Sequence, residues 1–499
     1  MLSKTRYTYG LQCHLRLYNH HHRPELAPAV SEATQHIFDF GHRVGELATH
    51  RWPGGLEIEA PHRDPDRAVA QTAAALDDPT ITAVYEASFR HRGVFIAVDV
   101  LARLPAGGWQ LVEVKSTSRV KEQHLHDAAI QLWVLRGAGV DVRQAGVLTL
   151  NTAYVYEGGD YDLQQLFTLH DVSDDIERLQ SGIDHNVIDM TATLRADGPP
   201  MIAMGRQCKK PYECPFMAAC SQTADLPERP VTLLPGVGPE TAEKWADQGV
   251  VELSDIPGGW PLTLRQRHAL SAALTGRPWV SDRLGSALQQ PHHPIHHLDF
   301  ETVMPGLPRW PGTRPFEQQP TQFSDHIERA DGTVDHIEYI HRGRGNPLRS
   351  VAEALLFALG EDEGSIVIYT SFEKTQIRQM ARACPDLAPQ LLALLDRCWD
   401  LKQVIDQHLY HPAFAGSYSL KAVVPALLPE RDYAALTISD GLAAVRAYEA
   451  ALAMPDGYER EAVFTQLLAY CEMDTLVMVE LRQKLAEMAA ASDSSSTDV

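Results

Sequence analysis

The sequence predicts an α/β protein with more than one domain, and three observations lead to this prediction. The chain has 499 residues, whereas single hydrophobic cores stop growing at about 250–300 residues. Helix-type and strand-type patterns alternate in two blocks, residues 1–222 and 291–488, which is typical of α/β units. A segment rich in proline and glycine, 226–290, separates the blocks, and the polar residues 489–499 are expected to form a disordered tail.

The composition is that of a globular protein with an acidic surface. Hydrophobic residues make up 44% and charged residues 22% of the chain, which excludes a largely disordered protein. The 44 Lys and Arg residues are outnumbered by 65 Asp and Glu residues, so the formal net charge is −21. Coating of nucleic acid by bulk charge depends on Lys and Arg, and the charge therefore excludes a coating protein.

Cysteine usage and hydropathy indicate a reducing compartment. Seven cysteines are too few for a disulfide scaffold in a chain of this length, and their number is odd. No apolar run approaches the roughly 18 residues of a membrane span, and residues 1–13 lack the apolar core of a signal peptide. The sequence therefore predicts a cytoplasmic protein without a membrane segment.

The first block has an early helix followed by strands on either side of a turn. Residues 31–50 have the periodicity of an amphipathic helix. Apolar and β-branched residues favour the strands, and proline and glycine favour the turn. The expected elements are strand 94–101, turn 105–108, strand 109–116, helix 121–137 and strand 146–150.

Three charged residues interrupt these apolar strands. Asp99 lies in VFIAVDVLA, and Glu113 and Lys115 lie in WQLVEVKS. Residues i and i+2 of a strand share a face, so Glu113 and Lys115 project together, and hairpin pairing brings Asp99 beside them. Two carboxylates can hold a divalent metal ion and a neighbouring lysine can orient water, as phosphodiester hydrolysis requires. Alternating charges on a solvated strand are the other interpretation.

This arrangement of acids and lysine resembles the PD-(D/E)XK nuclease superfamily and, more narrowly, its RecB-like branch. That branch carries a glutamine on the helix after the lysine strand, where this chain has Gln131, with Asp127 one turn earlier. The resemblance implies a restriction-endonuclease-like domain over residues 1–222. The branch often has an upstream Gly-x-x-x-His motif, but Gly45 stands at the histidine position after Gly41. The candidates for the missing ligand, each with a structural role as the alternative, are His42, Glu46 and Glu86.

Four cysteines lie at the two ends of the first block: Cys13 near its start, and Cys208, Cys214 and Cys220 at its end. Thiolates at such spacing bind zinc or an iron–sulfur cluster, and spacing alone does not separate the two. Buried free thiols are a third interpretation. Iron–sulfur nucleases of the RecB-like branch, including the CRISPR-associated nucleases, place one cysteine before the catalytic core and three after it. The resemblance therefore implies a 4Fe-4S cluster on these cysteines, an iron–sulfur clamp, although the gap before Cys214 is longer than usual.

The segment between the blocks resembles the hairpin of a helix–hairpin–helix motif. Residues 234–242 read LPGVGPETA, and Gly236 and Gly238 allow backbone N–H groups to approach a phosphate at a helix N-terminus. Contact with DNA and a purely structural linker over 226–290 are both open interpretations. The chain has no G-x-x-x-x-G-K-[ST] motif, so it shows no sign of a built-in ATPase motor.

The second block contains four acids in separate predicted elements. Asp299 and Glu301 share one face of the strand 295–301 because they are two residues apart. Glu373 follows the strand 365–369, and Asp474 lies on a helix predicted over 458–487. Tyr470 shares a face with Asp474. Such carboxylates can hold two divalent ions, one activating water and one stabilising the leaving oxygen, while Tyr470 orients the attacking water. The four acids are Asp299, Glu301, Glu373 and Asp474.

The order of these motifs resembles the tyrosine subclass of the DEDD exonucleases, which belong to the DnaQ-like, RNase H-like superfamily. Glu373 stands where that family usually has aspartate, and Asp400 is the alternative acid for this position. The segment 416–429 (GSYSLKAVVPALLP) resembles one that packs near the substrate in an uncharacterised bacterial family. That family fuses an iron–sulfur RecB-like nuclease to a DEDD-type domain. The resemblance covers roughly residues 3–488 and implies an RNase H-like domain over 291–488 with 3′–5′ exonuclease activity.

Our main hypothesis is a nuclease that hydrolyses DNA through two active sites and requires Mg²⁺ or Mn²⁺. DNA is favoured over RNA as the partner, and a helicase or a recombination or defence protein is a candidate protein partner. The alternatives are a nucleic-acid-binding scaffold in which one or both sites are inactive, and an RNA-processing exonuclease. The missing histidine at Gly45 makes the N-terminal site the stronger candidate for an inactive one.

Overall fold

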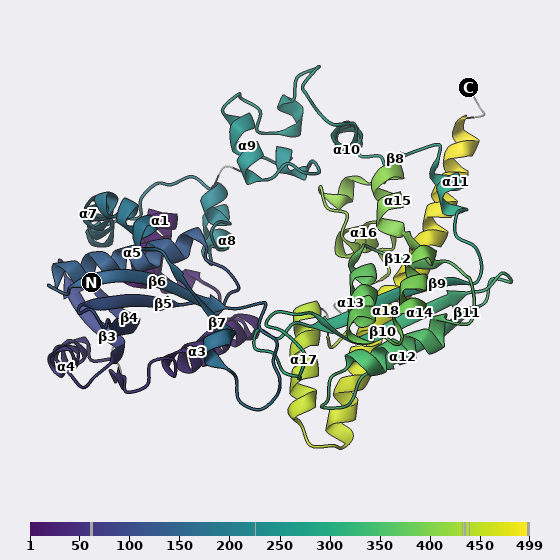
Figure 1. Cartoon of the computed structure of the whole chain (residues 1–499). Coiled ribbons are helices and arrows are strands. Elements are labelled where there is room, and N and C mark those ends of the chain that lie inside the picture. Colours follow the sequence, from purple (N-terminus) through teal and green to yellow (C-terminus); the bar gives the residue numbers. More distant parts are fainter. Residues whose placement is uncertain (60–62, 225, 432, 434–435, 439, 497–499) are drawn as a thin grey trace. The chain divides into compact units, whose positions relative to one another are not determined.

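The strands gather into two main sheets, one in each of two units (Figure 1). Unit 1 comprises Met1–Leu226 and Pro305–Glu317, and unit 2 comprises Pro227–Met304 and Gln318–Val499. The prediction of a mixed α/β protein with more than one domain is therefore confirmed. The computed structural model describes residues 1–59, 63–224, 226–431, 433, 436–438 and 440–496.

Unit 1 is built on a sheet with the strand order β2-β3-β4-β5-β6-β7, and β1 pairs with β4 outside this path. The central strand β4 is almost continuously apolar and buried, as expected for a strand covered on both faces. The pairs β2–β3, β5–β6 and β1–β4 are parallel and the other neighbours are antiparallel. The strands are β1 (Leu2–Ser3), β2 (Leu56–Glu57), β3 (Ala83–His91), β4 (Val94–Arg103), β5 (Trp109–Val114), β6 (Val142–Leu150) and β7 (Phe167–Asp171).

The helices of unit 1 begin and end at the residues that their capping chemistry favours. Ser31 accepts a hydrogen bond from the Thr34 amide at the start of α3, and Asp64 accepts one from the Arg67 amide at the start of α4. The predicted helices 31–50 and 121–137 correspond to α3 and α5. The helices are α1 (Lys4–Gln12), α2 (His14–His22), α3 (Glu32–Thr49), α4 (Pro65–Asp77), α5 (Glu122–Gly137), α6 (Leu163–Leu166), α7 (Ser173–Arg195) and α8 (Met217–Ser221).

A short segment from the middle of the second block belongs to unit 1. Pro305–Glu317 follows β9 in sequence, yet it packs within unit 1, where Leu307 joins the core that contains Val44 and Phe167. The Tyr156 amide donates to the Thr313 carbonyl at 2.9 Å, and the Gly312 amide donates to the Tyr156 carbonyl at 2.7 Å. Sequence analysis places this segment in the domain 291–488, because nothing in its local pattern indicates a distant partner.

Unit 2 contains a five-stranded sheet with the order β11-β10-β9-β12-β13 and a two-stranded sheet, β14-β8. The strands β11, β10 and β9 run antiparallel, whereas β12 runs parallel to β9 and β13. The strands are β8 (Trp279–Val280), β9 (Ile295–Val303), β10 (Gln319–Glu328), β11 (Val334–Ile340), β12 (Ile366–Ile368), β13 (Cys398–Asp400) and β14 (Leu409–Tyr410).

Helices cover both faces of the larger sheet. Leu298 and Phe300 of β9 join an apolar core with residues of α12 and α13, while α18 packs along β9 and β10. The alternation along β9 therefore turns Asp299 and Glu301 away from that core. The helices of unit 2 are α9 (Pro239–Ala246), α10 (Leu264–Thr275), α11 (Leu284–Leu288), α12 (Leu348–Leu359), α13 (Phe372–Ala383), α14 (Ala388–Ala393), α15 (Leu401–His408), α16 (Leu420–Leu427), α17 (Gly441–Ala453) and α18 (Tyr458–Ser496).

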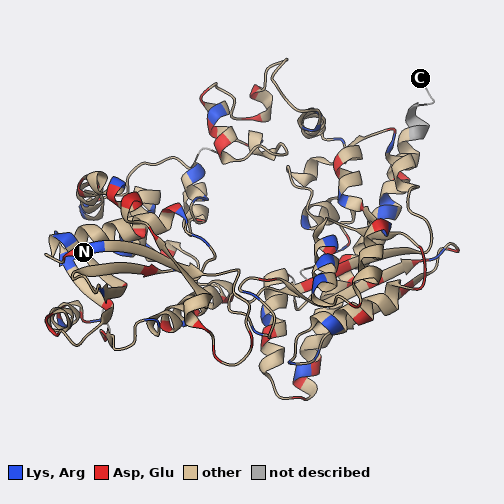
Figure 2. Cartoon of the chain, in the orientation of Figure 1, with Lys and Arg blue, Asp and Glu red and all other residues tan. Residues whose placement is uncertain are grey.

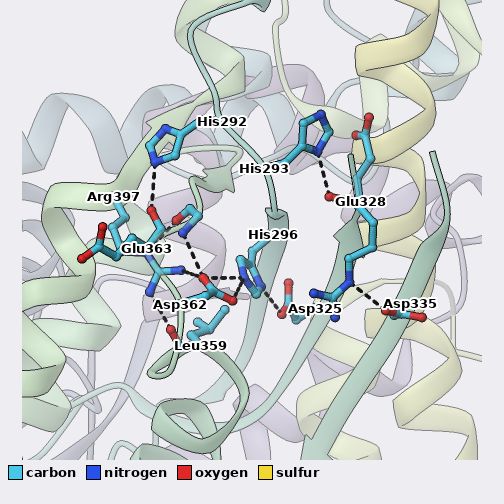
Figure 3. A network of polar contacts seen from close by, with 12 residues as sticks. His292, His293, His296, Asp325, Glu328, Asp335, Leu359, Asp362, Glu363 and Arg397 are labelled. Atoms are coloured by element: carbon cyan, nitrogen blue, oxygen red, sulfur yellow. Dashed lines mark hydrogen bonds and ion pairs between the residues drawn. The ribbon is translucent and has the colours of Figure 1, made fainter. Parts of the chain in front are cut away.

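A polar network around His296 holds β9 in place (Figure 3). His296 lies two residues before Leu298 on β9 and so shares its face of the strand. His296 Nδ1 lies 2.7 Å from Asp325 Oδ2, and its Nε2 lies 3.1 Å from Asp362 Oδ2. Arg397 Nη2 donates to Asp362 Oδ1 at 2.7 Å. Burial alone would lower the pKa of His296, but the two carboxylates raise it above its ordinary value. This network joins β9, β10 and the segment before β12.

Of residues 226–290, which the sequence pattern sets apart as a linker, 227–290 belong to unit 2. Val231, Leu234 and Leu253 lie in one apolar core with Tyr410 of β14 and Leu481 of α18. The element before the predicted hairpin is a three-residue 3-10 helix, Val231–Leu233, and not an α-helix. Gly236 has φ 75°, a left-handed conformation that favours glycine, and Gly238 precedes α9.

Helix α18 corrects two expectations about the C-terminal segment. It continues through Ser496, so the described part of the predicted tail 489–499 is helical. Its stretch Tyr458–Ser492 is long and apolar enough to cross a membrane by length and composition, although no such run was expected. Phe464, Leu467 and Leu481 of this helix are buried within unit 2. Packing in a protein core accounts for the apolar composition.

Candidate active sites

Three of the predicted acids of unit 2 meet at one place. Asp299 and Glu301 come from β9 and Asp474 from α18, and one carboxylate oxygen of each lies within 4.8 Å of the others. Glu373, in the first turn of α13, lies close enough to Asp299 for its charge to raise the pKa of that carboxyl. Oxygen ligands from several elements at such spacing can hold Mg²⁺ or Mn²⁺. The structure thus brings together the four acids that the sequence singles out.

The electrostatics of this cluster are those of carboxylates crowded together in a buried place. Burial and the charges of Asp474, Glu373 and Glu301 raise the pKa of Asp299 well above its ordinary value. Burial raises the pKa of Glu301 to about 8, with the charge of Asp474 adding to the effect. Burial is also the main cause for Glu373, with a pKa of about 7, and for Asp474, with a pKa of about 6. The Glu373 Oε2 atom is buried and has no hydrogen-bond partner among the residues that the structure describes.

Crowding of this kind favours a bound cation. Carboxylates repel one another when ionised, and a divalent ion between them would remove that repulsion and lower their pKa values. The charge of Lys421 partly offsets the burial of Glu301 and Asp474.

Two tyrosines accompany the acids. Tyr470 is 4% exposed and lies one turn before Asp474 on α18. Tyr433 donates a hydrogen bond from its hydroxyl to Asp474 Oδ1 at 2.8 Å. The i, i+4 spacing on α18 predicts that Tyr470 lies beside Asp474. It gives no sign of Tyr433, because no motif spacing relates Tyr433 to Asp474 across 41 residues. Burial and the neighbouring acids raise the pKa of both hydroxyls, so both stay protonated donors.

The alternative acid, Asp400, has a different role. Its Oδ1 accepts a hydrogen bond from the Gln403 amide at 2.9 Å and so caps the N-terminus of α15. Its charge reaches Glu373, whose pKa it helps to raise. The charge of Glu373 in turn raises the pKa of Asp299. A further unpredicted neighbour is Cys471, whose buried thiol lies 3.8 Å from Asp299 Oδ2.

The predicted residues of unit 1 also meet. The β4–β5 pairing begins at Val100 and Val112, and Asp99 Oδ2 accepts a hydrogen bond from the Val114 amide at 2.7 Å just beyond it. Glu113 is 1% exposed, so its carboxylate depends on protein partners. Its contacts are Lys115 Nζ at 2.8 Å and Gln131 Nε2 at 2.6 Å, and Lys115 Nζ lies 2.6 Å from Asp127 Oδ2.

A second lysine, which sequence analysis misses, contacts both acids. Lys4, the first residue of α1, places its Nζ 2.9 Å from Glu113 Oε1 and 3.7 Å from Asp99 Oδ1. Burial alone would raise the pKa of Glu113, but the Lys115 and Lys4 ammonium groups hold it well below its usual range. Burial and the charge of Glu113 raise the pKa of Asp99. The Lys4 ammonium lies where a cation would join the two carboxylates.

Of the three candidate replacements for the missing histidine, Glu86 is the one whose pKa the acids influence among the described residues. It stands opposite Asp99 at a gap in the β3–β4 pairing and has φ 54°, which a non-glycine residue rarely adopts. Burial and the charge of Asp99 raise the pKa of Glu86 to about 7. His42 and Glu46 on α3 are exposed, and among the described residues no hydrogen bond or ion pair joins them to these acids.

The four cysteines singled out by the sequence line one small cavity of unit 1. Cys13 lies between α1 and α2, Cys220 is in α8, and the Cys214 amide donates to the Cys208 carbonyl at 2.8 Å. Burial raises the pKa of Cys214 and of Cys220, and the neighbouring thiols raise it further. Within the described residues these sulfurs do not gather at the spacing of a single-ion site.

Charge is mixed over the ribbon of both units. Figure 2 shows red and blue segments interspersed along each, with neither unit coloured mainly blue. This agrees with the formal net charge of −21. Contact with phosphate groups would therefore depend on local cations or bound metal ions, and not on a basic face.

Comparison with known proteins gives one partial match. A family model described as a domain of unknown function (DUF2779) matches residues 296–419. The matched part runs from β9 through β14 to the residue before α16 and contains Asp299, Glu301 and Glu373, whereas Asp474 lies outside it. No curated protein and no solved structure matches the chain significantly.

Proposed function

We propose that this protein is a metal-dependent nuclease whose main active site is formed by Asp299, Glu301, Glu373 and Asp474. The observation that carries the proposal is the meeting of these carboxylates from β9, α13 and α18, with pKa values raised by burial and mutual repulsion. Such a cluster supports an RNase H-like, DEDD-type domain with 3′–5′ exonuclease activity. Divalent ions bound there would supply an activated water and stabilise the leaving oxygen.

The side chains around the cluster have definite tasks in this proposal. Tyr470 keeps its proton and can donate a hydrogen bond to the attacking water. Tyr433 orients Asp474 through its 2.8 Å hydrogen bond. The burial of Glu373 limits the access of bulk water to its side of the cluster. These are positioning tasks, and the acids themselves would contact the metal ions and the phosphodiester.

For unit 1 we propose a restriction-endonuclease-like, RecB-like site formed by Asp99, Glu113, Lys115 and Gln131. The contact of Lys4 with both acids favours a second candidate function for this unit, a nucleic-acid-binding scaffold with an inactive site. An ammonium group that joins the two carboxylates would compete with Mg²⁺ or Mn²⁺ for the same oxygens. The two candidates differ in whether unit 1 cuts DNA once unit 2 is inactivated.

For the cysteine cavity we propose a 4Fe-4S cluster. The lining of one cavity by Cys13, Cys208, Cys214 and Cys220 supports it, since a cluster lies between its thiolates and keeps their sulfurs farther apart than a single ion does. Protein purified without oxygen should contain iron and sulfide. Stoichiometric zinc instead of iron would contradict this assignment.

We also propose DNA as the substrate in preference to RNA, a cytoplasmic location, and a helicase or a recombination or defence protein as partner. Digestion of end-labelled DNA and RNA with Mg²⁺ or Mn²⁺ tests the nuclease activity and the preference between the two substrates. The double variant Asp299→Ala plus Asp474→Ala should abolish release of nucleotides from 3′ ends, and Asp99→Ala plus Lys115→Ala should remove any cutting by unit 1. Wild-type protein that binds DNA and RNA but cuts neither would contradict the nuclease proposal, and faster digestion of RNA would favour the RNA-processing alternative.

A further inference from the structure

A second group of metal-ligand side chains lies on the α18 face of the same sheet, apart from the four acids. His326 of β10, His336 of β11 and Glu472 of α18 each offer one donor atom, and these atoms lie within 4.8 Å of one another. The two histidines are direct cross-strand partners, and their rings stack with centroids 4.3 Å apart. Two facing strands and the helix that covers them therefore converge on one place.

Two buried hydroxyls occupy one nitrogen of each ring. The Thr475 hydroxyl lies 2.8 Å from His326 Nδ1, 2.7 Å from the Ser324 hydroxyl and 3.1 Å from the Glu472 carbonyl oxygen. The Ser324 hydroxyl lies 2.9 Å from His336 Nε2. Each ring therefore has a buried hydroxyl that can accept its N–H.

In the tautomer in which each ring donates its N–H to its hydroxyl, His326 Nε2 and His336 Nδ1 each carry a lone pair. His336 Nδ1 lies 4.0 Å from Glu472 Oε1. Metal-binding histidines characteristically donate their other N–H to a fixed acceptor, which sets the tautomer and the ring orientation. Ser324 and Thr475 are both fully buried and so are fixed acceptors. A pair of stacked histidines in a core needs neither a buried hydroxyl acceptor for each ring nor a carboxylate within 4.8 Å of both.

We propose that His326, His336 and Glu472 bind one divalent transition-metal ion of the zinc class. Two neutral imidazoles and one carboxylate are a ligand set that zinc accepts, with a water in the fourth position. The side chains of His336 and Glu472 are 24% and 47% exposed, which gives an ion and a water access from solvent. The Asp299 cluster offers only oxygen ligands and suits Mg²⁺ or Mn²⁺, so the two sites differ in the metal that they select.

The ion would join the β10–β11 hairpin to α18 two residues before Asp474. Ser324 is the cross-strand partner of Asp299, and His326 is the partner of His297, so the histidine site lies one step along the sheet from the acids. A bound ion would fix α18 against β10 and β11 at that position. The site would therefore stabilise unit 2, and it does not depend on the nuclease proposal.

Zinc stoichiometry in the full-length protein tests the inference. Chelator-treated wild type and variants are dialysed against Zn²⁺ and analysed for bound metal. His336→Ala and Glu472→Gln alter partly exposed side chains, and each should lose one equivalent of Zn²⁺ relative to wild type. Thr475→Val removes the hydroxyl that lies against His326 Nδ1. It should lower the affinity of this site for Zn²⁺ by about 10–100-fold. The same equivalent should raise the Tm of wild type but not that of His336→Ala.

Three controls separate this site from the other possible zinc ligands. His185→Ala alters an exposed histidine of α7 that is ion-paired with Asp189, and it should leave the zinc count unchanged. Asp474→Asn should retain the equivalent that His336→Ala loses. With Co²⁺ as a spectroscopic probe, the lost equivalent should lack thiolate-to-metal charge-transfer absorption, because its ligands exclude the cysteines. Equal zinc counts and affinities in wild type and His336→Ala, or loss of this equivalent in Asp474→Asn, would overturn the inference.

Discussion

At the scale of single residues, the chemistry of unit 2 depends on carboxylates that are buried close to one another. The pKa values of Glu301, Glu373 and Asp474 are raised to about 8, 7 and 6, so the folded chain holds protons that the unfolded chain releases. In the absence of a metal ion, ionisation of these groups opposes folding. The crowding of buried carboxylates suits the cluster for a divalent ion. The same crowding lowers the free energy of unfolding of unit 2 when the ion is removed.

We predict that the free energy of unfolding of metal-free unit 2 falls as pH rises from about 4.5 to 8. The folded state binds more protons than the unfolded state across that range, so each rise in pH favours unfolding, and the loss is complete above the folded pKa of Glu301, about 8. Glu301→Gln should raise the free energy of unfolding by about 1–3 kcal/mol at pH 8 in chelator. Denaturant unfolding measures this, with exposed Glu361→Gln as the control. A loss of stability in Glu301→Gln would contradict the prediction.

At the same scale, Lys4 neutralises the acids of unit 1. We predict that Lys4→Met lowers the free energy of unfolding of unit 1 by roughly 2–4 kcal/mol in chelator, because Glu113 is buried and loses one of its two cationic partners. Mg²⁺ should restore more stability to this variant than to wild type. Denaturant unfolding with and without Mg²⁺ measures both effects, and Lys209→Met, at an exposed lysine, is the control. If Mg²⁺ raises the free energy of unfolding of Lys4→Met and of wild type equally, the Lys4 ammonium does not occupy the position of a metal ion.

At the scale of elements, alternation along β9 divides two functions between the faces of one strand. His296 and Leu298 face α12 and α13, where a polar network and an apolar core hold the strand, while Asp299 and Glu301 face α18. This division follows from the two-residue period of a strand and was predictable from the sequence. The elements that pack against each face of β9 were not predictable, because they lie far along the chain.

We predict that the turn into β12 tolerates no side chain at Gly364. A Cβ atom there would lie 1.9 Å from the Pro294 carbonyl oxygen, and backbone cannot move aside cheaply. Gly364→Ala should therefore lower the free energy of unfolding of unit 2 by roughly 2–4 kcal/mol. Gly285→Ala on α11 is the matched control, since its nearest contact would be an ordinary 3.7 Å. Thermal unfolding compares the two, and equal Tm values would contradict the prediction.

At the scale of the whole molecule, the units do not coincide with blocks of sequence. Residues 227–290 share the core of unit 2, and Pro305–Glu317 belongs to unit 1 although the strands on either side of it belong to unit 2. Composition shifts predicted the boundary near residue 222, because proline and glycine mark it locally. No local signal marks the segment 305–317, since its place depends on the tyrosines and apolar residues of unit 1 with which it packs.

We predict that Leu307→Ala weakens unit 1 and not the strands next to it in sequence. Leu307 is 7% exposed in a core of unit 1, and its truncation should cost about 2–4 kcal/mol. Hydrogen exchange should become faster in α3 and β7 and stay unchanged in β9 and β10. Exposed Leu392→Ala on α14 is the control. Faster exchange in β9 alone would show that the segment follows its sequence neighbours.

The sequence by itself determined the features that depend on local period and spacing. These are the strands and helices around the two acid clusters, the shared face of Asp299 and Glu301, and the shared face of Tyr470 and Asp474. The tertiary structure alone decided the contacts of Lys4 with Glu113, of Tyr433 with Asp474, and of His326 with His336 and Glu472. The physical reason is that strand register and helix packing bring these residues together across long stretches of chain, and the pattern around any one of them does not specify its partner.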